Sequence, residues 1–522
     1  MARPTSRIAL LAVSALIASA CTGGGGTSSE SADPGAVPTI GAVPTAPGTP
    51  VPLGPAGTGG GKNATGGGQA GGGGAGGGQA ASSGGGSGAV ASGGGGGGGG
   101  GSAGGSGSGG GKQGGGGGGG YQGIPSSKLP NVTLFSPEEE RVGLTDNQIT
   151  LCTHAALVFA DAFDTKIPDL NVFWDWVNDN GGIYGRKVAM SYEDDAYAPD
   201  TAVQAATRCK AKNPFMLLGG IGFDQIPAVR NWAEQNRMLY LHHIARLDLS
   251  KQFSFSFQPS VEQVGAMAAQ WILQAHRNEK IGVVWRQSAN WQPGYQTFKD
   301  TLVSAGVNLV ADLPVQQNQA VYSQQIVQLQ QSSAEVVFLW ENALASTEFS
   351  RQSKSQGYDP TLVMFPFNLE TDTLGEESLH PPFEGIATWP AYSPNMDEGP
   401  YASERKEFEA ALKKYGSGAR GNDILWMTWL GWKQVYQWFL DCGPDCTRNK
   451  MVALLIANTQ KPVVPTCGLD FSKNGHVGGY QGTVFEAFKR PSKATYEDTK
   501  CADRRCNVGW QEIQHCKLKV PF

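Results

Sequence analysis

The residues best suited to acid–base chemistry are Glu193, Asp194 and Asp195, which end the strand-like segment KVAMSYEDD. Adjacent side chains on a strand alternate between its two faces, so this spacing does not aim two carboxylates at one substrate. His242 and His243 are also adjacent, and we expect them on opposite faces, with one buried and neither catalytic. Downstream of the glycine-rich region there is no G-x-S-x-G, H-E-x-x-H or G-x-x-x-x-G-K-[ST] pattern. The sequence therefore predicts no enzyme, no catalytic residues and no cofactor.

Nine cysteines offer a second kind of chemistry. Cys21 follows an export-type leader, and the other eight are an even number, which is typical of disulfides in an exported protein. Two pairs are spaced closely enough to suggest a metal site, but neither has C-x-x-C spacing and no histidine pair completes it. We therefore expect four disulfides and no metal. Cys152 and Cys209 are expected to pair because they stand alone in the first half of the chain. The pairing of six others stays open: Cys442, Cys446, Cys467, Cys501, Cys506 and Cys516.

The first 21 residues, MARPTSRIALLAVSALIASAC, have the pattern of a secretory signal. Arg3 and Arg7 precede an apolar run over 8–17 that is too short to span a membrane, and small residues follow it. The ending Ala-Ser-Ala-Cys resembles a bacterial lipobox, although Ala18 stands where lipoboxes usually have Leu. Ala-Ser-Ala is also a cleavage site by itself. We favour lipidation of Cys21, which predicts an extracytoplasmic protein tethered to the outer face of the cell membrane.

Residues 22–123 have an unusual composition. They are Pro-rich over 34–55 and Gly-rich over 56–123, with almost no charge and few large apolar side chains. Such a chain cannot bury enough surface to offset its conformational entropy, so we expect a disordered tether about 50–60 Å in root-mean-square span. The whole chain has a formal net charge of −5 and scattered basic residues, which argues against binding nucleic acid or anionic lipid.

From residue 147 onward, apolar runs of strand length alternate with segments of helical period. QITLCTHA, KVAMSYED and PFMLLGGIG are expected to be strands separated by helices. The pattern restarts after FSFSFQPS with KIGVVWRQ, AEVVFLWEN and TLVMFPF. This alternation predicts an α/β fold with mostly parallel, doubly wound sheets in two units of similar size. The Trp-rich segment NDILWMTWLGWKQVYQWFLD is expected to be a helix with its tryptophans in the core.

The segment NDNGGIYGRKVAMSYEDDAYAPD, residues 178–200, links a helix that ends at Gly181 and Gly182 to a strand, and Pro199 opens the next helix. This combination resembles the first lobe of type I periplasmic solute-binding proteins, the branched-chain amino acid and amide receptors of ABC importers. GGIGFDQIPAVRNWAEQNRMLYL, VVWRQSANWQPGYQTF and SRQSKSQGYDPTLV extend the resemblance over roughly residues 147–490. The resemblance implies two Rossmann-like lobes, joined by three crossovers, that close on a ligand by hinge motion.

The resemblance also implies a division of the chain. The signal and lipobox occupy 1–21 and the tether 22–123, the first lobe 147–258 and 391–457, and the second lobe 259–390 and 458–522 with a cysteine-rich tail. The crossovers are expected near 257–260, near 389–393 and after Ala457. Ligands of such folds bind at the carboxyl ends of the strands, in the cleft.

The positions that hold an amino-acid ligand in this family carry other residues here. Gly222, Arg246 and Trp291 replace two hydroxyl residues and a tyrosine, and Phe367 stands near the place of the glutamate that binds the ammonium group. Arg246 offers a bidentate grip on a carboxylate, which favours a small organic acid, aromatic acids included. Glu341 offers a partner for a cation, which would favour an amino acid instead. The expected ligand-binding residues are Gly222, Phe223, Ala245, Arg246, Trp291, Trp340, Glu341 and Phe367.

The resemblance implies a monomeric substrate-binding lipoprotein that captures a small solute and delivers it to an ABC permease. The alternative is a sensory receptor on the same fold, which would pass its ligand-bound state to a signalling partner. Neighbouring genes for a permease and an ATPase would favour import, and a neighbouring kinase gene would favour sensing. A secreted enzyme is a third alternative, and turnover of a bound ligand would be its signature.

Overall fold

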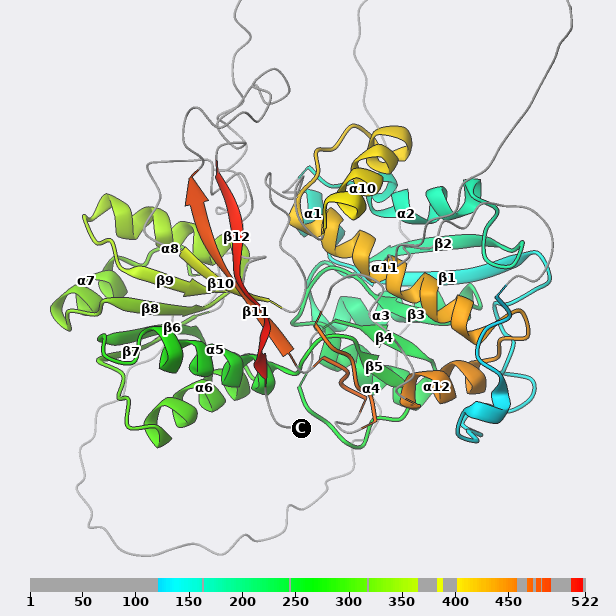
Figure 1. Cartoon of the computed structure of the whole chain (residues 1–522), viewed down its shortest axis with the longest axis horizontal. Coiled ribbons are helices and arrows are strands. Elements are labelled where there is room, and N and C mark those ends of the chain that lie inside the picture. The colour runs from blue at the N-terminus through cyan, green and yellow to red at the C-terminus, as the bar shows by residue number, and fades with distance from the viewer. Residues whose placement is uncertain are drawn as a thin grey trace, which may run out of the picture. The chain divides into compact units, whose positions relative to one another are not determined.

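The structure is a computed structural model (Figure 1). It describes residues 121–161, 164–243, 246–316, 319–364, 383–387, 401–457, 467–472, 476–479, 481–489 and 508–519. The signal segment, Cys21 and all but the last residues of the predicted tether lie outside this part of the chain.

Five parallel strands form the first sheet, in the order β2-β1-β3-β4-β5. These strands are β1 (Gln148–Ala155), β2 (Lys187–Asp194), β3 (Met216–Gly219), β4 (Tyr240–His242) and β5 (Ser254–Ser256). The strand order reverses at β1, which lies between β2 and β3, and such a switch point is where open α/β sheets bind ligands. β5 lies in the segment FSFSFQPS, just before the predicted crossover at 257–260, and no strand was predicted there.

Four helices alternate with the strands of this sheet: α1 (Leu157–Asp161), α2 (Ile167–Asp179), α3 (Pro199–Ala211) and α4 (Ile226–Asn236). The predicted joint between α2 and β2 is confirmed, because Gly181 and Gly182 both have positive φ, at 98° and 74°. A Cβ atom on Gly182 would lie 2.0 Å from the carbonyl oxygen of Arg186, so the turn requires glycine. Pro199 is the first residue of α3, as predicted.

Seven strands form the second sheet, in the order β12-β11-β10-β9-β8-β6-β7. They are β6 (Ile281–Arg286), β7 (Ala311–Val315), β8 (Val336–Trp340), β9 (Thr361–Met364), β10 (Phe383–Ala387), β11 (Gln481–Lys489) and β12 (Val508–Lys519). The pairs from β7 through β10 are parallel, and β11 and β12 are antiparallel additions at one edge. The two sheets confirm the predicted α/β class with mostly parallel, doubly wound strands.

The helices of the second half are α5 (Val261–Ala275), α6 (Gln292–Ser304), α7 (Ser323–Gln331) and α8 (Ala343–Ser355). Ser260 begins α5 with a reciprocal cap: its hydroxyl accepts from the N–H of Gln263, and the Gln263 side chain accepts from the N–H of Ser260. This cap satisfies two backbone N–H groups at the start of the helix and so fixes its first residue. The residues at the predicted first crossover, 257–260, therefore lie between β5 of one sheet and the helix that leads into the other.

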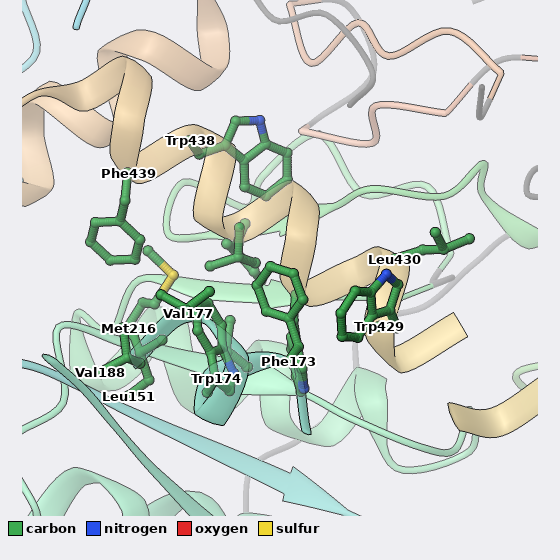
Figure 2. Packing of buried hydrophobic residues seen from close by; sticks show 14 of the residues in the cluster. Leu151, Phe173, Trp174, Val177, Val188, Met216, Trp429, Leu430, Trp438 and Phe439 are labelled. Atoms are coloured by element: carbon green, nitrogen blue, oxygen red, sulfur yellow. The ribbon is translucent and has the colours of Figure 1, made fainter. Parts of the chain in front are cut away.

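Three further helices follow: α10 (Ala402–Tyr415), α11 (Asp423–Cys442) and α12 (Arg448–Ile456). The Trp-rich helix α11 returns to the first sheet, where Trp432 lies against Trp174 of α2. Figure 2 shows side chains of α11 and α2 packed over residues of the first sheet. The labelled members of this cluster are Leu151, Phe173, Trp174, Val177, Val188, Met216, Trp429, Leu430, Trp438 and Phe439. The expectation that the tryptophans of this helix belong to the core is confirmed.

Residues 121–147 are packed against the helices, although the sequence analysis assigned no element to 124–146. They contain a short 3-10 helix over Ser126–Lys128. Phe135 is buried, and its N–H donates to the side chain of Asn449, at 2.8 Å. The N–H of Ile124 donates to the carbonyl of Asp441, at 2.6 Å. The packed domain therefore begins about where the glycine-rich segment ends.

Three disulfides lie in the described part of the chain. Cys152 is bonded to Cys209, the pairing that the sequence analysis singles out, and it ties β1 to α3. The other two bridges are Cys442–Cys446 and Cys467–Cys516. Cys501 and Cys506 lie outside the described residues, as do two of the predicted crossovers, in 388–400 and 458–466. The exact lobe boundaries remain predictions.

Candidate functional site

The ends of three strands bring a charged cluster together. Asp224 follows β3 of the first sheet, Arg286 is the last residue of β6, and Glu341 follows β8 of the second sheet. Nη1 of Arg286 donates to Oδ2 of Asp224 at 2.8 Å, and Nε of Arg286 lies 3.2 Å from Oε2 of Glu341. One guanidinium therefore lies between two carboxylates contributed by different sheets.

All three charged side chains of the cluster are buried. The exposed fractions are 1% for Arg286, 6% for Asp224 and 2% for Glu341. Burial, opposed by the nearby guanidinium of Arg286, raises the pKa of Glu341 to about 7. Burial also raises the pKa of Asp224 above its usual range, against the opposite effects of Arg286 and Trp291. A single cation thus serves two buried carboxylates, which is the kind of charge arrangement found at functional sites.

Aromatic side chains enclose this cluster. Nε1 of Trp291 donates to Oδ1 of Asp224 at 2.8 Å, and the ring of Phe223 meets the Trp291 ring edge-on at 4.8 Å. Trp340, which is fully buried, donates from Nε1 to the carbonyl of Trp291 at 2.8 Å. The structure therefore brings together Phe223, Trp291, Trp340 and Glu341, four of the predicted ligand-binding residues.

Gly222 precedes this group and has a constrained backbone. Its φ is 120°, and a Cβ atom there would lie 2.0 Å from the side-chain nitrogen of Gln225. That nitrogen donates to Asp195 at 2.9 Å and to the carbonyl of Ile221 at 3.0 Å. A serine at position 222 would have a strained backbone and would require the Gln225 side chain to move, so the hydroxyl of the family pattern does not fit this conformation.

Arg246, the carboxylate clamp expected from the sequence, lies elsewhere. Its side chain is 51% exposed, and its Nε atom is 3.7 Å from a carboxylate oxygen of Glu262 on α5. Its carbonyl accepts from Nη1 of Arg230 at 2.7 Å. No contact recorded among the described residues joins Arg246 to the cluster around Arg286. Ala245 and Phe367, the two remaining predicted site residues, lie outside the described residues.

The sequence analysis missed Asp224 and Arg286. A sequence feature could have indicated each of them. Arg286 is a cation at the carboxyl end of the otherwise apolar strand IGVVWR, and Asp224 directly follows the glycine-rich segment GGIGF. A charged residue at the carboxyl end of a buried parallel strand has no solvent to face, so it needs a partner or a ligand. The resemblance pointed to Arg246, because it matches positions in the sequence and carries no information on the surroundings of each side chain.

A second buried network lies at the carboxyl end of the first sheet. His154 contacts Oδ2 of Asp195 through Nδ1 at 2.8 Å and the hydroxyl of Tyr240 through Nε2 at 2.7 Å. His242 is the last residue of β4 and His243 follows it, and both are buried, whereas we expected only one to be. Asp195 also accepts from Nε2 of Gln225 and from the N–H of Tyr197, each at 2.9 Å, so this network ties the end of β1 to the chain that follows β2 and β3.

The buried histidines make the stability of the fold dependent on pH. Burial lowers the pKa of His243 to about 4, below the ordinary value of 6.5 that applies in the unfolded chain. The neutral form is therefore favoured by folding, and its contribution is complete above pH 6.5 and is lost as the pH falls toward 4. Between pH 7.5 and pH 5, we expect the wild type to lose about 2 kcal/mol more unfolding free energy than a His243→Gln variant. Urea unfolding at both pH values measures this, with the exposed His515→Gln as the matched control. Equal pH dependence in the wild type and His243→Gln would contradict the assignment.

The comparisons with known proteins agree with this fold. A family model described as "Periplasmic binding protein" matches residues 171–487. The chain therefore belongs to the periplasmic binding protein family, and its two mostly parallel sheets are those of the type I members. A search of curated proteins finds no match.

Solved structures with this fold cover most of the chain. A fatty acid ABC transporter substrate-binding protein from Thermomonospora curvata is 15% identical, with a TM-score of 0.58, and the match covers 72% of this chain and 94% of that one. A solute-binding protein of an ABC transporter from R. palustris, in complex with benzoate, is 13% identical over 72% of this chain and 97% of that one, with a TM-score of 0.55. A Rhodopseudomonas palustris BisB5 protein in complex with 3,4-dihydroxybenzoic acid is 13% identical over 72% and 99%, with a TM-score of 0.54. At these identities the likeness establishes the fold alone.

Neither a membrane span nor a metal site is present among the described residues. None of the helices within those ranges combines the length and the apolar character that a membrane span requires. No group of three or more His, Cys, Asp or Glu side chains in the same ranges has the arrangement of a metal site.

Proposed function

We propose that this protein is the extracytoplasmic substrate-binding component of an ABC importer and that its ligand is a small organic acid. The buried guanidinium of Arg286, at the carboxyl end of β6, is the observation that supports this ligand class. Its Cζ atom lies 5.5 Å from the centroid of the Trp291 ring. A desolvated guanidinium with several N–H donors is suited to binding a carboxylate. The aromatic rings of Phe223 and Trp340 supply apolar walls next to it.

The structural relatives support this ligand class. Two of them are in complex with benzoate and 3,4-dihydroxybenzoic acid, and the third is a fatty acid transporter component; each of these compounds carries a carboxylate and an apolar body. The same combination suits one cation among aromatic rings. We therefore assign the role of carboxylate clamp to Arg286 rather than Arg246, and we keep Gly222, Phe223, Trp291, Trp340 and Glu341 as the neighbouring site residues. Ala245 and Phe367 remain candidates for the same site on the resemblance alone.

The proposed function includes a cellular location outside the cytoplasm. Lipidation at Cys21 would anchor the protein at the outer face of the cell membrane, and the segment 22–123 would let the monomeric binding domain reach its permease. Three disulfides in the described residues suit an oxidising compartment outside the cytoplasm. Catalysis is not needed for capture and delivery.

A thermal unfolding panel tests the ligand class and the clamp together. Residues 121–522 are produced by an oxidising export route and mixed with benzoate, 3,4-dihydroxybenzoate, octanoate, leucine and urea. A ligand at a hundred times its dissociation constant adds about 2.7 kcal/mol of stability, so the carboxylates are expected to raise the Tm by several degrees. The shift should persist in Arg246→Ala and disappear in Arg286→Met. A shift with leucine alone, or one that Arg246→Ala removes and Arg286→Met keeps, would contradict the proposal.

A further inference from the structure

The carboxylate of Asp224 is bound in the way that a free carboxylate ligand would be bound. Its Oδ2 atom accepts from Nη1 of Arg286 and its Oδ1 atom accepts from Nε1 of Trp291, each at 2.8 Å. Asp224 follows β3 of the first sheet, whereas both donors follow or end β6 of the second sheet. Two donors, one for each oxygen, form a receptor for a planar carboxylate that belongs to the second sheet alone.

Contacts within the second half of the chain hold this receptor in place without Asp224. The ring of Trp291 packs edge-on against Trp340 at 5.9 Å, and the carbonyl of Trp291 accepts from Trp340 at 2.8 Å. Gly294 allows this close packing, because a Cβ atom there would lie 2.2 Å from the Trp340 ring. On the other side, Nε of Arg286 lies 3.2 Å from Glu341. The two N–H donors are therefore oriented before any carboxylate arrives, which is the condition for a preorganised binding site.

The charges allow Asp224 to be replaced. Arg286 has a second carboxylate partner in Glu341, so departure of Asp224 does not leave a buried cation without a counter-charge. The main chain at Asp224 is tied separately, because its carbonyl accepts from the side chain of Asn290 at 3.0 Å. The segment after β3 can thus stay near β6 while the Asp224 side chain gives up its place.

We propose that Arg286 and Trp291 form a carboxylate subsite which Asp224 occupies as an internal substitute, and that a ligand carboxylate binds by replacing it. This inference rests on the proposed function for the ligand, but the subsite itself is defined by the contacts of Asp224. Asp224 is then the residue that sets affinity, because every ligand must compete with a carboxylate held at very high local concentration. Ligands without an acidic group are excluded from the subsite, because they cannot accept from both donors as Asp224 does.

Chemical rescue of Asp224→Ala tests the subsite without knowledge of the natural ligand. The variant, made from residues 121–522, is expected to have a Tm several degrees below that of the wild type. Formate, acetate or benzoate should restore at least half of the loss in a saturable way, while chloride at equal ionic strength should not. Rescue should vanish in the double variant Asp224→Ala, Arg286→Met. Absence of saturable rescue, or rescue by chloride alone, would overturn the proposal.

A matched control is available at Asp312, which accepts from Nε1 of Trp285 at 2.9 Å and from Nζ of Lys299 at 2.8 Å. Like Asp224, it accepts from an indole and a cation, but it also accepts from the hydroxyl of Tyr295 at 2.5 Å. Its side chain is 30% exposed, and these three partners all belong to the second half of the chain. Asp312→Ala should therefore lose stability that carboxylates do not restore, because water reaches this site and its cation, the flexible Lys299, is 40% exposed. Equal rescue at both positions would show a general salt effect and would overturn the assignment of the subsite.

If Asp224→Ala does not fold, the Asp224→Asn variant tests whether Asp224 competes with ligand carboxylates for Arg286. The amide keeps the volume but removes the charge, so it is a weaker competitor for Arg286. Titration calorimetry with benzoate should show an affinity at least ten-fold higher than in the wild type. An equal or weaker affinity would overturn the role of Asp224 as a competitor. Rescue of Asp224→Ala combined with no carboxylate binding to the wild type would keep the subsite but refute the proposed ligand class.

Discussion

Replacing Arg286 by methionine is expected to lower the unfolding free energy by about 3–5 kcal/mol, because removing one partner of a buried ion pair leaves the other charges uncompensated. Here two carboxylates would be affected, since Asp224 and Glu341 both lie within 3.2 Å of the guanidinium nitrogens and are almost fully buried. The loss should be larger at pH 8 than at pH 6. The wild-type cost of burying Glu341 grows from its usual pKa up to about 7 and is constant above it, whereas without Arg286 the pKa of Glu341 rises further and the cost keeps growing. Urea unfolding of the wild type and the variant at both pH values measures the difference.

The control for this prediction removes all three charges at once. The triple variant Arg286→Met, Asp224→Asn, Glu341→Gln contains no buried ion in the cluster, so it should recover about half or more of the stability lost in Arg286→Met. A second control, Arg246→Ala, removes an exposed arginine with a distant partner and should change the unfolding free energy by less than about 0.5 kcal/mol. If Arg286→Met were as stable as the wild type, the cluster would not be an ion pair that the fold depends on.

Truncating Trp429 to alanine is expected to destabilise the protein by about 3–5 kcal/mol through loss of buried surface and formation of a cavity. The side chain is 2% exposed, and its ring meets Phe173 of α2 at 4.9 Å (Figure 2). It also meets Phe408 of α10 at 5.7 Å. Its Nε1 atom also donates to Glu404, so the variant removes a partner from a carboxylate. This one side chain therefore joins α11 to α2 and α10, beside the first sheet.

Thr428→Ala is the matched control, because residue 428 precedes Trp429 on the same helix and is only partly buried. It should change the unfolding free energy by less than about 1 kcal/mol. Thermal unfolding followed by circular dichroism measures both variants. A Trp429→Ala protein with wild-type stability would show that α11 does not depend on its packing against α2 and α10.

Much of the fold follows from local sequence signals. The alternation of strand and helix segments, the glycines of the joint at 181–182 and the helix start at Pro199 all appear in the structure as expected. These features depend on residues close to one another in the chain, where propensity and backbone conformation decide the outcome. The packed segment around Phe135 was not expected, because its partners Asn449 and Arg448 lie more than three hundred residues away in sequence.

The candidate site was only partly predictable for a similar reason. Trp291, Trp340, Phe223 and Glu341 were found because they occupy family positions at strand ends, and the structure brings them together. Asp224 and Arg286 were not predicted as site residues, because in the sequence each is an ordinary charged residue. Their contact exists only in the folded chain, where the two sheets bring their side chains to 2.8 Å. Arg246 was predicted from its family position alone, and its side chain is 51% exposed, 3.7 Å from Glu262, so its role in ligand binding stays a prediction.

Titration calorimetry of residues 121–522 with benzoate and 3,4-dihydroxybenzoate, in the wild type and in Arg286→Met, tests the central claim most directly. The account predicts one carboxylate bound for each chain of the wild type, undiminished binding in Arg246→Ala, and no heat of binding in Arg286→Met at matched concentration and folded fraction. Binding that survives the loss of Arg286, or tight binding of a solute with no acidic group in place of these carboxylates, would contradict it.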